Sequence, residues 1–275
     1  MNLVEIEKVV ASIRSNLFRN SNSFSIGMLK SHFKGAGLQF KEHQVYAPGD
    51  DVRFIDWKLS AKSDNTFVKT FEEERNVEII VVLDLSQSML TGYRGVSKLQ
   101  SCIEIACLLY LLAEQTKDKV KVIILFDKVT ILPSQSGQGG IVLFISMLEK
   151  MGVLNEKGKV NLLLDFEQKV EEKKRLSILK SFIARGKEVV YLSDFTEIDD
   201  HETLNKLIYR PNMHCFKIVS PLDEAKKYPF SILSKIKGKK RLVNAFAVEN
   251  EGVKGRFKKI NVANRYLDEF VKEML

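Results

Sequence analysis

One short stretch of the sequence constrains the fold more than any other. Residues 77–86 read V-E-I-I-V-V-L-D-L-S, a run of apolar and β-branched residues that ends in a polar loop, and a helical pattern begins near Ser97. A strand that is apolar on both faces is typical of a parallel sheet covered by helices on both sides. The stretch therefore predicts a central strand of such a sheet.

The alternation of strand and helix continues along the chain. Further strands are expected at 120–126, 129–132, 188–193 and 214–219, and helices at 97–112, 140–150, 176–184 and 202–209. Strands joined by helices of this length run parallel with right-handed crossovers. The predicted fold class is therefore α/β, a doubly wound, mostly parallel sheet with helices on both faces. The tail at 241–262 is expected to form a hairpin or paired strands, and 263–275 a closing helix.

The first quarter of the chain follows a different pattern. Residues 3–19 carry apolar side chains at helical spacing, which predicts an amphipathic helix, whereas residues 21–71 are irregular and contain several glycines and a proline. We therefore expect two parts. Residues 1–75 would hold an N-terminal helix and an irregular segment packed on the core, and residues 76–275 would form the α/β domain.

Polar side chains directly follow two of the expected core strands. Asp84, Ser86 and Ser88 alternate in D-L-S-Q-S-M, and Asp194 follows the strand at 188–193. Because parallel strands end at one sheet edge, where ligands gather in such folds, we expect these oxygens to lie together. Carboxylate and hydroxyl oxygens suit Mg²⁺ or Mn²⁺, so we favour a metal site. The alternative is that Asp84 caps a helix and the serines only form a turn.

The sequence around these motifs resembles a known family. Residues 40–62, F-K-E-H-Q-V-Y-A-P-G-D-D-V-R-F-I-D-W-K-L-S-A-K, are followed by F-V-K-T-F-E-E-E-R and then D-L-S-Q-S-M. Together they resemble the prokaryotic family named domain of unknown function 58, which is similar to von Willebrand factor A domains. The likeness is strong over about residues 30–150 and rests on topology elsewhere.

The resemblance implies a metal-ion-dependent adhesion site. The D-L-S-Q-S string would form its first motif and the later aspartate its last. The middle motif of such sites is usually a threonine before a helix, and P-S-Q-S-G-Q-G-G offers Ser134 or Ser136 instead, of which we select Ser136. Two further departures are Gln44 and Lys62, where the family pattern has arginine.

The P-G-D-D-V-R-F-I-D-W string has two interpretations. Asp50, Asp51, Arg53, Asp56 and Trp57 are close together in sequence, and polar groups are costly to bury unpaired. We favour a structural network of Arg53 with the carboxylates, anchored by Trp57. The alternative is a docking surface for a partner.

Composition and charge narrow the partners and the location. A formal net charge of +8 favours acidic partners, and basic clusters at 235–241 and 254–259 could meet nucleic acid, although no aromatic residues alternate with them. The three cysteines form no C-x-x-C pair, so we expect reduced core residues. The amino terminus carries acidic residues where a secretory signal has basic ones, and we expect a cytoplasmic protein without membrane insertion.

Several enzyme classes lack their motifs here. A phosphotransferase of the haloacid dehalogenase type needs a second aspartate two residues after the first, and the chain has Ser86 there. No nucleotide-binding G-x-x-x-x-G-K-[ST] loop exists, and the S-I-L-K string at 177–180 lacks its companion motifs. We therefore expect a protein without catalytic activity.

The expected function is a metal-dependent protein-binding adaptor whose bound ion accepts a carboxylate from a partner. The resemblance implies that this partner is an AAA+ ATPase of the MoxR class, and that the pair assembles or activates other proteins in a chaperone-like way. The alternatives are a nucleic-acid-binding module that uses the basic carboxyl-terminal clusters and, with less support, a metal-dependent phosphatase.

Overall fold

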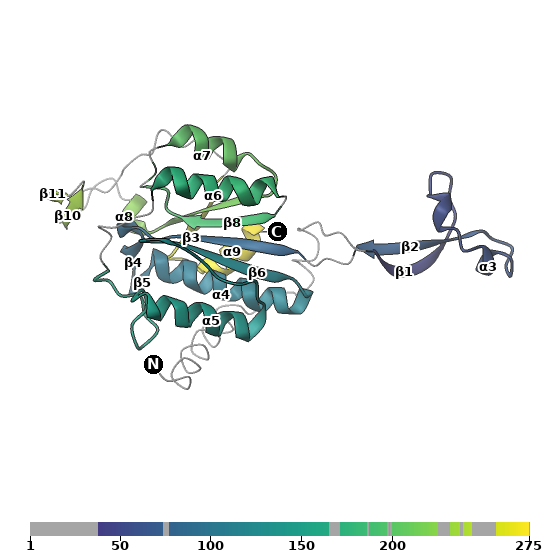
Figure 1. The fold of residues 1–275 in the computed structure, drawn as a ribbon, viewed down its shortest axis with the longest axis horizontal. Helices are drawn as coiled ribbons and strands as arrows, with labels where there is room; N and C mark the ends of the chain where they lie inside the picture. The colour runs from purple at the N-terminus through teal and green to yellow at the C-terminus, as the bar shows by residue number, and fades with distance from the viewer. Residues whose placement is uncertain are drawn as a thin grey trace.

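The centre of the fold is a six-stranded sheet built around the predicted strand. The computed structural model describes residues 38–73, 77–164, 171–185, 187–196, 198, 200–224, 232–236, 239–243 and 257–274. The strands of the sheet, in the order β12-β9-β8-β3-β6-β7, are Phe257–Asn261, Met213–Val219, Glu188–Ser193, Glu78–Asp84, Lys119–Leu125 and Val129–Ile131 (Figure 1). Neighbouring strands run parallel except β7, which pairs antiparallel with β6 at one edge.

Helices cover both faces of this sheet. One face carries α4 (Lys98–Thr116), α5 (Gly137–Lys150) and α9 (Tyr266–Met274), and the other carries α6 (Glu172–Ala184) and α7 (His201–Ile208) (Figure 1). Alternate side chains of β3 enter the two layers: Val81 joins one apolar cluster, and Val82 joins the other. The α/β class with a mostly parallel sheet is therefore confirmed. The helix expected at 3–19 lies outside the described residues.

The order of the strands creates a switch point at β3. After β3 the chain adds β6 and β7 on one side, and it then crosses back to add β8, β9 and β12 on the other. In sheets of this kind, the crevice outside the carboxyl ends of the strands at such a point is where ligands bind. Asp84 ends β3 and Asp194 directly follows β8, so both aspartates lie at this point.

Short elements at this carboxyl edge set the start of α4. After β3 come the 3-10 turn η2 (Gln87–Leu90) and the two-residue strands β4 (Gly92–Tyr93) and β5 (Val96–Ser97). The Ser97 hydroxyl accepts a hydrogen bond from the Gln100 amide at 3.0 Å, a standard helix cap. This cap fixes Lys98 as the first residue of the helix.

The segment before the sheet forms an antiparallel hairpin where an irregular chain was expected. Its strands are β1 (Leu38–Val45) and β2 (Phe67–Glu73), and the connection contains the 3-10 turn η1 (Val52–Phe54) and the short helix α3 (Trp57–Ser60). Figure 1 draws this hairpin arm clear of the six-stranded sheet. The two strands of such an arm need no regular alternation of apolar and polar residues, and the sequence therefore contains no strand pattern that would have predicted the hairpin.

The tail differs from the prediction as well. A hairpin does form, but from β10 (Ile232–Ile236) and β11 (Lys239–Val243), mostly before residue 241. The later strand β12 instead pairs parallel with β9 and becomes the sixth strand of the main sheet. The closing helix is confirmed as α9, and α8 (Pro221–Glu224) follows β9 at the carboxyl edge.

A close contact between α4 and α5 gives a test of the packing. A Cβ added at Gly140 would lie 2.3 Å from Tyr110 Cδ1, whereas one at Gly139 meets no heavy atom within 4 Å. We expect Gly140→Ala to lower the free energy of unfolding by about 1–3 kcal/mol, because overpacking forces side chains apart. Gly139→Ala, the control on the same helix, should change it by no more than about 1 kcal/mol, towards higher stability. Urea unfolding of both variants measures this, and equal effects would contradict the contact.

Candidate functional site

Asp84 is held by a buried polar network. Only 3% of this residue is exposed. Its Oδ1 accepts a hydrogen bond from Arg175 Nη1 at 2.6 Å, and its Oδ2 accepts from Tyr191 Oη at 3.0 Å and Ser193 Oγ at 3.4 Å. Burial raises the pKa of Asp84, and the adjacent Arg175 opposes that rise. Asp84 therefore contacts α6 and β8 rather than capping the following helix.

A row of three hydroxyls lies beside it. Ser86 Oγ is 3.0 Å from Ser88 Oγ, and Thr196 Oγ1 is 2.8 Å from both Ser88 Oγ and Asp194 Oδ1. Ser86 stands at the N-cap position of η2, yet its side chain makes no capping hydrogen bond. We call Ser86, Ser88 and Thr196 the hydroxyl row. Together with Asp194 they bring four side chains with hard oxygen atoms into one place.

An unusual backbone conformation orients the end of this row. Phe195 has φ 57°, in the left-handed region that bulky side chains rarely adopt. Its ring is buried edge-on against Tyr191, with ring centroids 5.1 Å apart, and also contacts Phe257. The turn allows the Thr196 amide to donate to Asp194 Oδ1 at 3.2 Å. The aromatic packing thus stabilises the backbone that keeps Asp194 and Thr196 in contact.

A lysine occupies the other side of Asp194. Lys98 Nζ lies 2.8 Å from Asp194 Oδ2 and 3.1 Å from each carboxylate oxygen of Asp223, and Lys98 is fully buried. Burial alone would lower the pKa of Lys98, but its two carboxylate partners raise it overall. Burial would likewise raise the pKa of Asp194, yet the Lys98 charge outweighs it and lowers that pKa.

Several residues of this site were not identified from the sequence, among them Thr196, Lys98, Arg175 and Asp223. Thr196 could have been found, because D-F-T repeats the spacing of the D-L-S motif. Lys98 carried a weaker signal, a charge at the start of a helix whose middle is mostly apolar. Arg175 lies in E-E-K-K-R, and Asp223 in P-L-D-E, where nothing distinguishes them from ordinary surface charges.

Ser134 and Ser136 lie at the opposite edge of the sheet. Ser134 Oγ donates to Glu78, the first residue of β3, and Ser136 precedes α5. Asp84 ends the same seven-residue strand, roughly 20 Å away at about 3.3 Å per residue. The reason is the antiparallel strand β7, which returns the chain to the amino edge before α5 starts. Inclusion of Ser136 in the metal set was therefore wrong, and Thr196 is the hydroxyl that joins the other residues.

The P-G-D-D-V-R-F-I-D-W string lies on the hairpin arm, and most of its residues are exposed. Arg53 pairs with Asp51, with Nη2 2.6 Å from Oδ2, but the Arg53 side chain is 81% exposed. Asp50 accepts a turn hydrogen bond from the Ala47 amide. Trp57 is 70% exposed. Arg53 therefore pairs with one carboxylate of the string as expected, but Trp57, which was expected to anchor this network, is available at the surface.

Asp56 is the residue of this string that organises the arm. Its carboxylate accepts from the Leu59 amide at 3.0 Å, and lies 3.0 Å from His43 Nε2 and 3.3 Å from Lys69 Nζ. These contacts lower the pKa of Asp56 to about 2, and the hydrogen bond from the Leu59 amide contributes most. Asp56 thus ties α3 to both strands of the hairpin.

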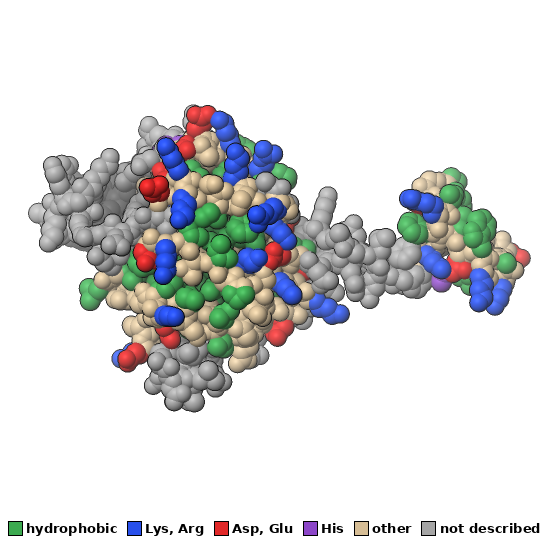
Figure 2. All heavy atoms as spheres, in the orientation of Figure 1, with side chains coloured by type: hydrophobic (Ala, Val, Ile, Leu, Met, Phe, Trp, Pro, Cys, Tyr) green, Lys and Arg blue, Asp and Glu red, His purple; other side chains and the backbone are tan. Residues whose placement is uncertain are grey.

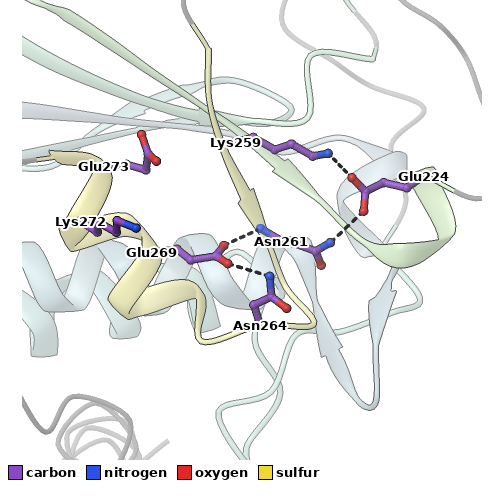
Figure 3. Close-up of a pocket in the computed structure, with 7 residues that line it drawn as sticks. All are labelled: Glu224, Lys259, Asn261, Asn264, Glu269, Lys272 and Glu273. Atoms are coloured by element: carbon purple, nitrogen blue, oxygen red, sulfur yellow. Dashed lines mark hydrogen bonds and ion pairs between the residues drawn. The ribbon is translucent and has the colours of Figure 1, made fainter.

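A polar hollow lies among α8, β12 and α9 (Figure 3). Glu224 pairs with Lys259 and accepts from Asn261 Nδ2 at 3.0 Å, and Glu269 accepts from the Asn261 amide at 3.0 Å and from Asn264 at 2.7 Å. Figure 3 shows these side chains directed at one another from α8, β12 and α9. Most of the polar groups that line the hollow therefore already have partners within the domain.

The donor atoms fit a hard divalent cation with one restriction. Three hydroxyls and Asp194 supply the oxygen ligands that Mg²⁺ and Mn²⁺ accept. Among the described residues, no group of three or more His, Cys, Asp or Glu could hold a metal, so any site here depends on the hydroxyl row. The restriction is that Lys98 and Arg175 already neutralise Asp194 and Asp84.

The ion pair of Asp84 with Arg175 gives a test of the site's architecture. We expect Arg175→Met to lower the free energy of unfolding by about 3–5 kcal/mol, because it leaves a buried carboxylate without its cation. Adding Asp84→Asn to that variant should recover part of the loss. Exposed Arg210 is the control, and Arg210→Met should stay within about 0.5 kcal/mol of wild type in urea unfolding. Equal effects of the two arginine substitutions would contradict the network.

Comparison with known proteins gives limited likenesses. Uncharacterized proteins of Mycobacterium tuberculosis (strain H37Rv) and Mycobacterium bovis are 36% identical over 58 residues, which cover 21% of this chain and 18% of each relative. The matched segment thus spans less than a fifth of those relatives. Of the helices in the described ranges, none has the length and apolar character needed to cross a membrane.

Two solved structures are similar at low identity. BatB from Bacteroides thetaiotaomicron gives a TM-score of 0.42 at 16% identity, covering 72% of this chain and 97% of that chain. An aerotolerance-related membrane protein from Bacteroides fragilis gives 0.41 at 17%, covering 72% and 98%. The family described as "Protein of unknown function DUF58" matches residues 42–233. This match covers more than half of the chain, and the protein therefore belongs to the DUF58 family.

Proposed function

We propose that this chain is a non-catalytic, metal-dependent protein-binding adaptor. The observation that carries the proposal is the hydroxyl row beside Asp194 at the switch point of the sheet. Neutral hydroxyls and one carboxylate are a donor set of low charge, which leaves a bound divalent cation able to accept another anionic ligand. Ser88 and Thr196 are half-buried rather than sealed, so a partner's side chain can reach them.

In this proposal the hydroxyl row and Asp194 would hold Mg²⁺ or Mn²⁺, which would supply an electrophilic contact for a carboxylate of the partner. The ion then binds more tightly when the partner is present, and the partner binds more tightly when the ion is present, because the partner's carboxylate completes the coordination of the ion. The affinity for the partner therefore depends on the metal concentration.

The state of Asp84 favours binding over catalysis. A nucleophilic aspartate must face its substrate, as in the phosphatase alternative. Both carboxylate oxygens of Asp84 instead accept hydrogen bonds from buried protein groups, Arg175 on one oxygen and Tyr191 on the other. This arrangement supports a structural role for Asp84, which the sequence analysis places among the metal ligands.

The nucleic-acid alternative has less support. Of its basic clusters, Lys258 donates to the Glu273 carbonyl and Lys259 pairs with Glu224. These two ammonium groups are engaged within the domain and would have to be released to neutralise phosphates.

The proposed partner is an AAA+ ATPase of the MoxR class in the cytoplasm, with chaperone-like assembly or activation of other proteins as the outcome. This part of the proposal rests on the family resemblance. The hairpin arm offers a second contact, since Figure 2 shows apolar side chains next to basic ones on its surface, and Val45, Val52 and Trp57 are exposed there.

Titration calorimetry with Mn²⁺ and Mg²⁺ tests the metal site. We expect Thr196→Val and Ser88→Ala to weaken metal binding by about tenfold or more, in line with the loss seen when groups around a metal are removed. Ser136→Ala is the matched control and should bind as wild type does, because Ser136 lies at the other edge. The metal-dependent proposal fails if wild type binds neither ion.

A second experiment tests the partner. Tagged wild type, Thr196→Val and Ser136→Ala are used to capture the purified MoxR-class ATPase of the same organism in constant Mg²⁺. Variants are preferable to a chelator, which would also remove Mg²⁺ from the nucleotide of the ATPase. We expect capture by wild type and Ser136→Ala but not by Thr196→Val. Equal capture by all three would show that the metal site is not the contact.

The arm can be tested in the same assay. We expect Trp57→Ala to weaken capture by about tenfold or more, since large exposed aromatic residues often dominate interfaces. The thermal midpoint should not change, because Trp57 is 70% exposed. Tyr209, 63% exposed on the main domain, is the control, and Tyr209→Ala should leave capture intact. Loss of capture in both variants, or in neither, would argue against a specific role of the arm.

A further inference from the structure

Lys98 is in a position that is unfavourable for a lysine. It is the first residue of the 19-residue helix α4, where the exposed amides give the helix a partial positive charge. It is also completely buried, although lysine is among the residues least often buried. Both effects disfavour an ammonium group, so the compensation must come from its partners, Asp194 and Asp223.

The two oxygens of Asp194 face different groups. Oδ1 contacts Thr196 and, through it, the rest of the hydroxyl row, whereas Oδ2 contacts Lys98 Nζ at 2.8 Å. A divalent cation held by the hydroxyl row would share this single carboxylate with the ammonium group. Two cations on one carboxylate repel each other, so each lowers the affinity of the other for that carboxylate.

Asp223 provides an alternative place for the lysine charge. Both of its oxygens lie 3.1 Å from Lys98 Nζ, and its side chain is 27% exposed, compared with 4% for Asp194. Asp223 also accepts hydrogen bonds from the Ser220 amide and hydroxyl, which fix its position. The ammonium group can therefore keep one carboxylate partner when Asp194 turns to another cation.

We propose that Lys98 is a tethered cation that competes with the divalent ion for Asp194 and thereby makes metal binding depend on the partner's carboxylate. This inference rests on the metal-dependent function proposed above. Without the partner, the ammonium group neutralises Asp194 and keeps the metal affinity low. When the partner adds its own negative charge, the divalent ion outcompetes Lys98, which stays paired with Asp223.

The test compares Lys98→Gln and Lys98→Met with wild type by calorimetry with Mn²⁺ in the absence of any partner. Glutamine keeps a hydrogen-bond donor near Asp194 without the charge, and so provides a folded variant if methionine does not. We expect both to bind Mn²⁺ at least about tenfold more tightly than wild type, on the scale of other changes next to metal ligands. Mn²⁺ should also raise their thermal midpoints more than that of wild type. Lys121, which pairs with Glu78 at the opposite edge, is the control, and Lys121→Gln should bind as wild type does.

The outcomes separate this inference from the proposed function. If wild type binds Mn²⁺ and the Lys98 variants bind it equally well, the tethered-cation inference is wrong and the metal site stands. If only the Lys98 variants bind Mn²⁺, Lys98 takes the place of the metal in the native protein, and the metal-dependent function fails together with the inference. If no variant binds, or if Lys121→Gln tightens binding as much as the Lys98 variants do, the inference is overturned.

Discussion

The two buried ion pairs at the carboxyl edge of the sheet connect the layers of the fold. Asp84, at the end of β3, pairs with Arg175 from the helix layer on one face, and Asp194, after β8, pairs with Lys98 from the layer on the other. A buried charge without its counter-charge costs several kcal/mol, so neither helix can move away from the sheet alone. The apolar layers supply most of the stabilisation, and these pairs fix how the helices align on the strands.

In the proposed function, the same edge also receives a ligand. The charges of Asp84 and Asp194 are neutralised inside the protein, whereas the hydroxyl row consists of neutral groups joined by hydrogen bonds of 2.8 to 3.0 Å. The left-handed turn at Phe195 carries its strain because its ring packs on Tyr191, whose own hydroxyl donates to Asp84. The geometry of the hydroxyl row is therefore set by the aromatic packing behind it as well as by its own contacts.

Sequence patterns predicted what depends on local periodicity. The apolar run of β3 and the spacing in α4 are visible within a few residues, and parallel strands place Asp84 and Asp194 at one edge by geometry alone. The arm hairpin was missed because its strands are not buried on a regular face. Ser136 was assigned to the wrong edge of the sheet because the direction of β7 decides at which edge α5 begins. Lys98 was missed because its partners are distant in sequence.

The separation of these partners along the chain affects how the protein is made. Lys98 precedes Asp194 by 96 residues, and Asp84 precedes Arg175 by 91, so both early charges leave the ribosome long before their counter-charges. A nascent chain that ends before Arg175 contains the central strand and its long apolar helix but cannot bury either charge favourably. Domains generally fold as units during synthesis, and this one must wait for its carboxyl-terminal half. During that interval the apolar residues of β3 and α4 are open to aggregation and to the chaperones that bind nascent chains.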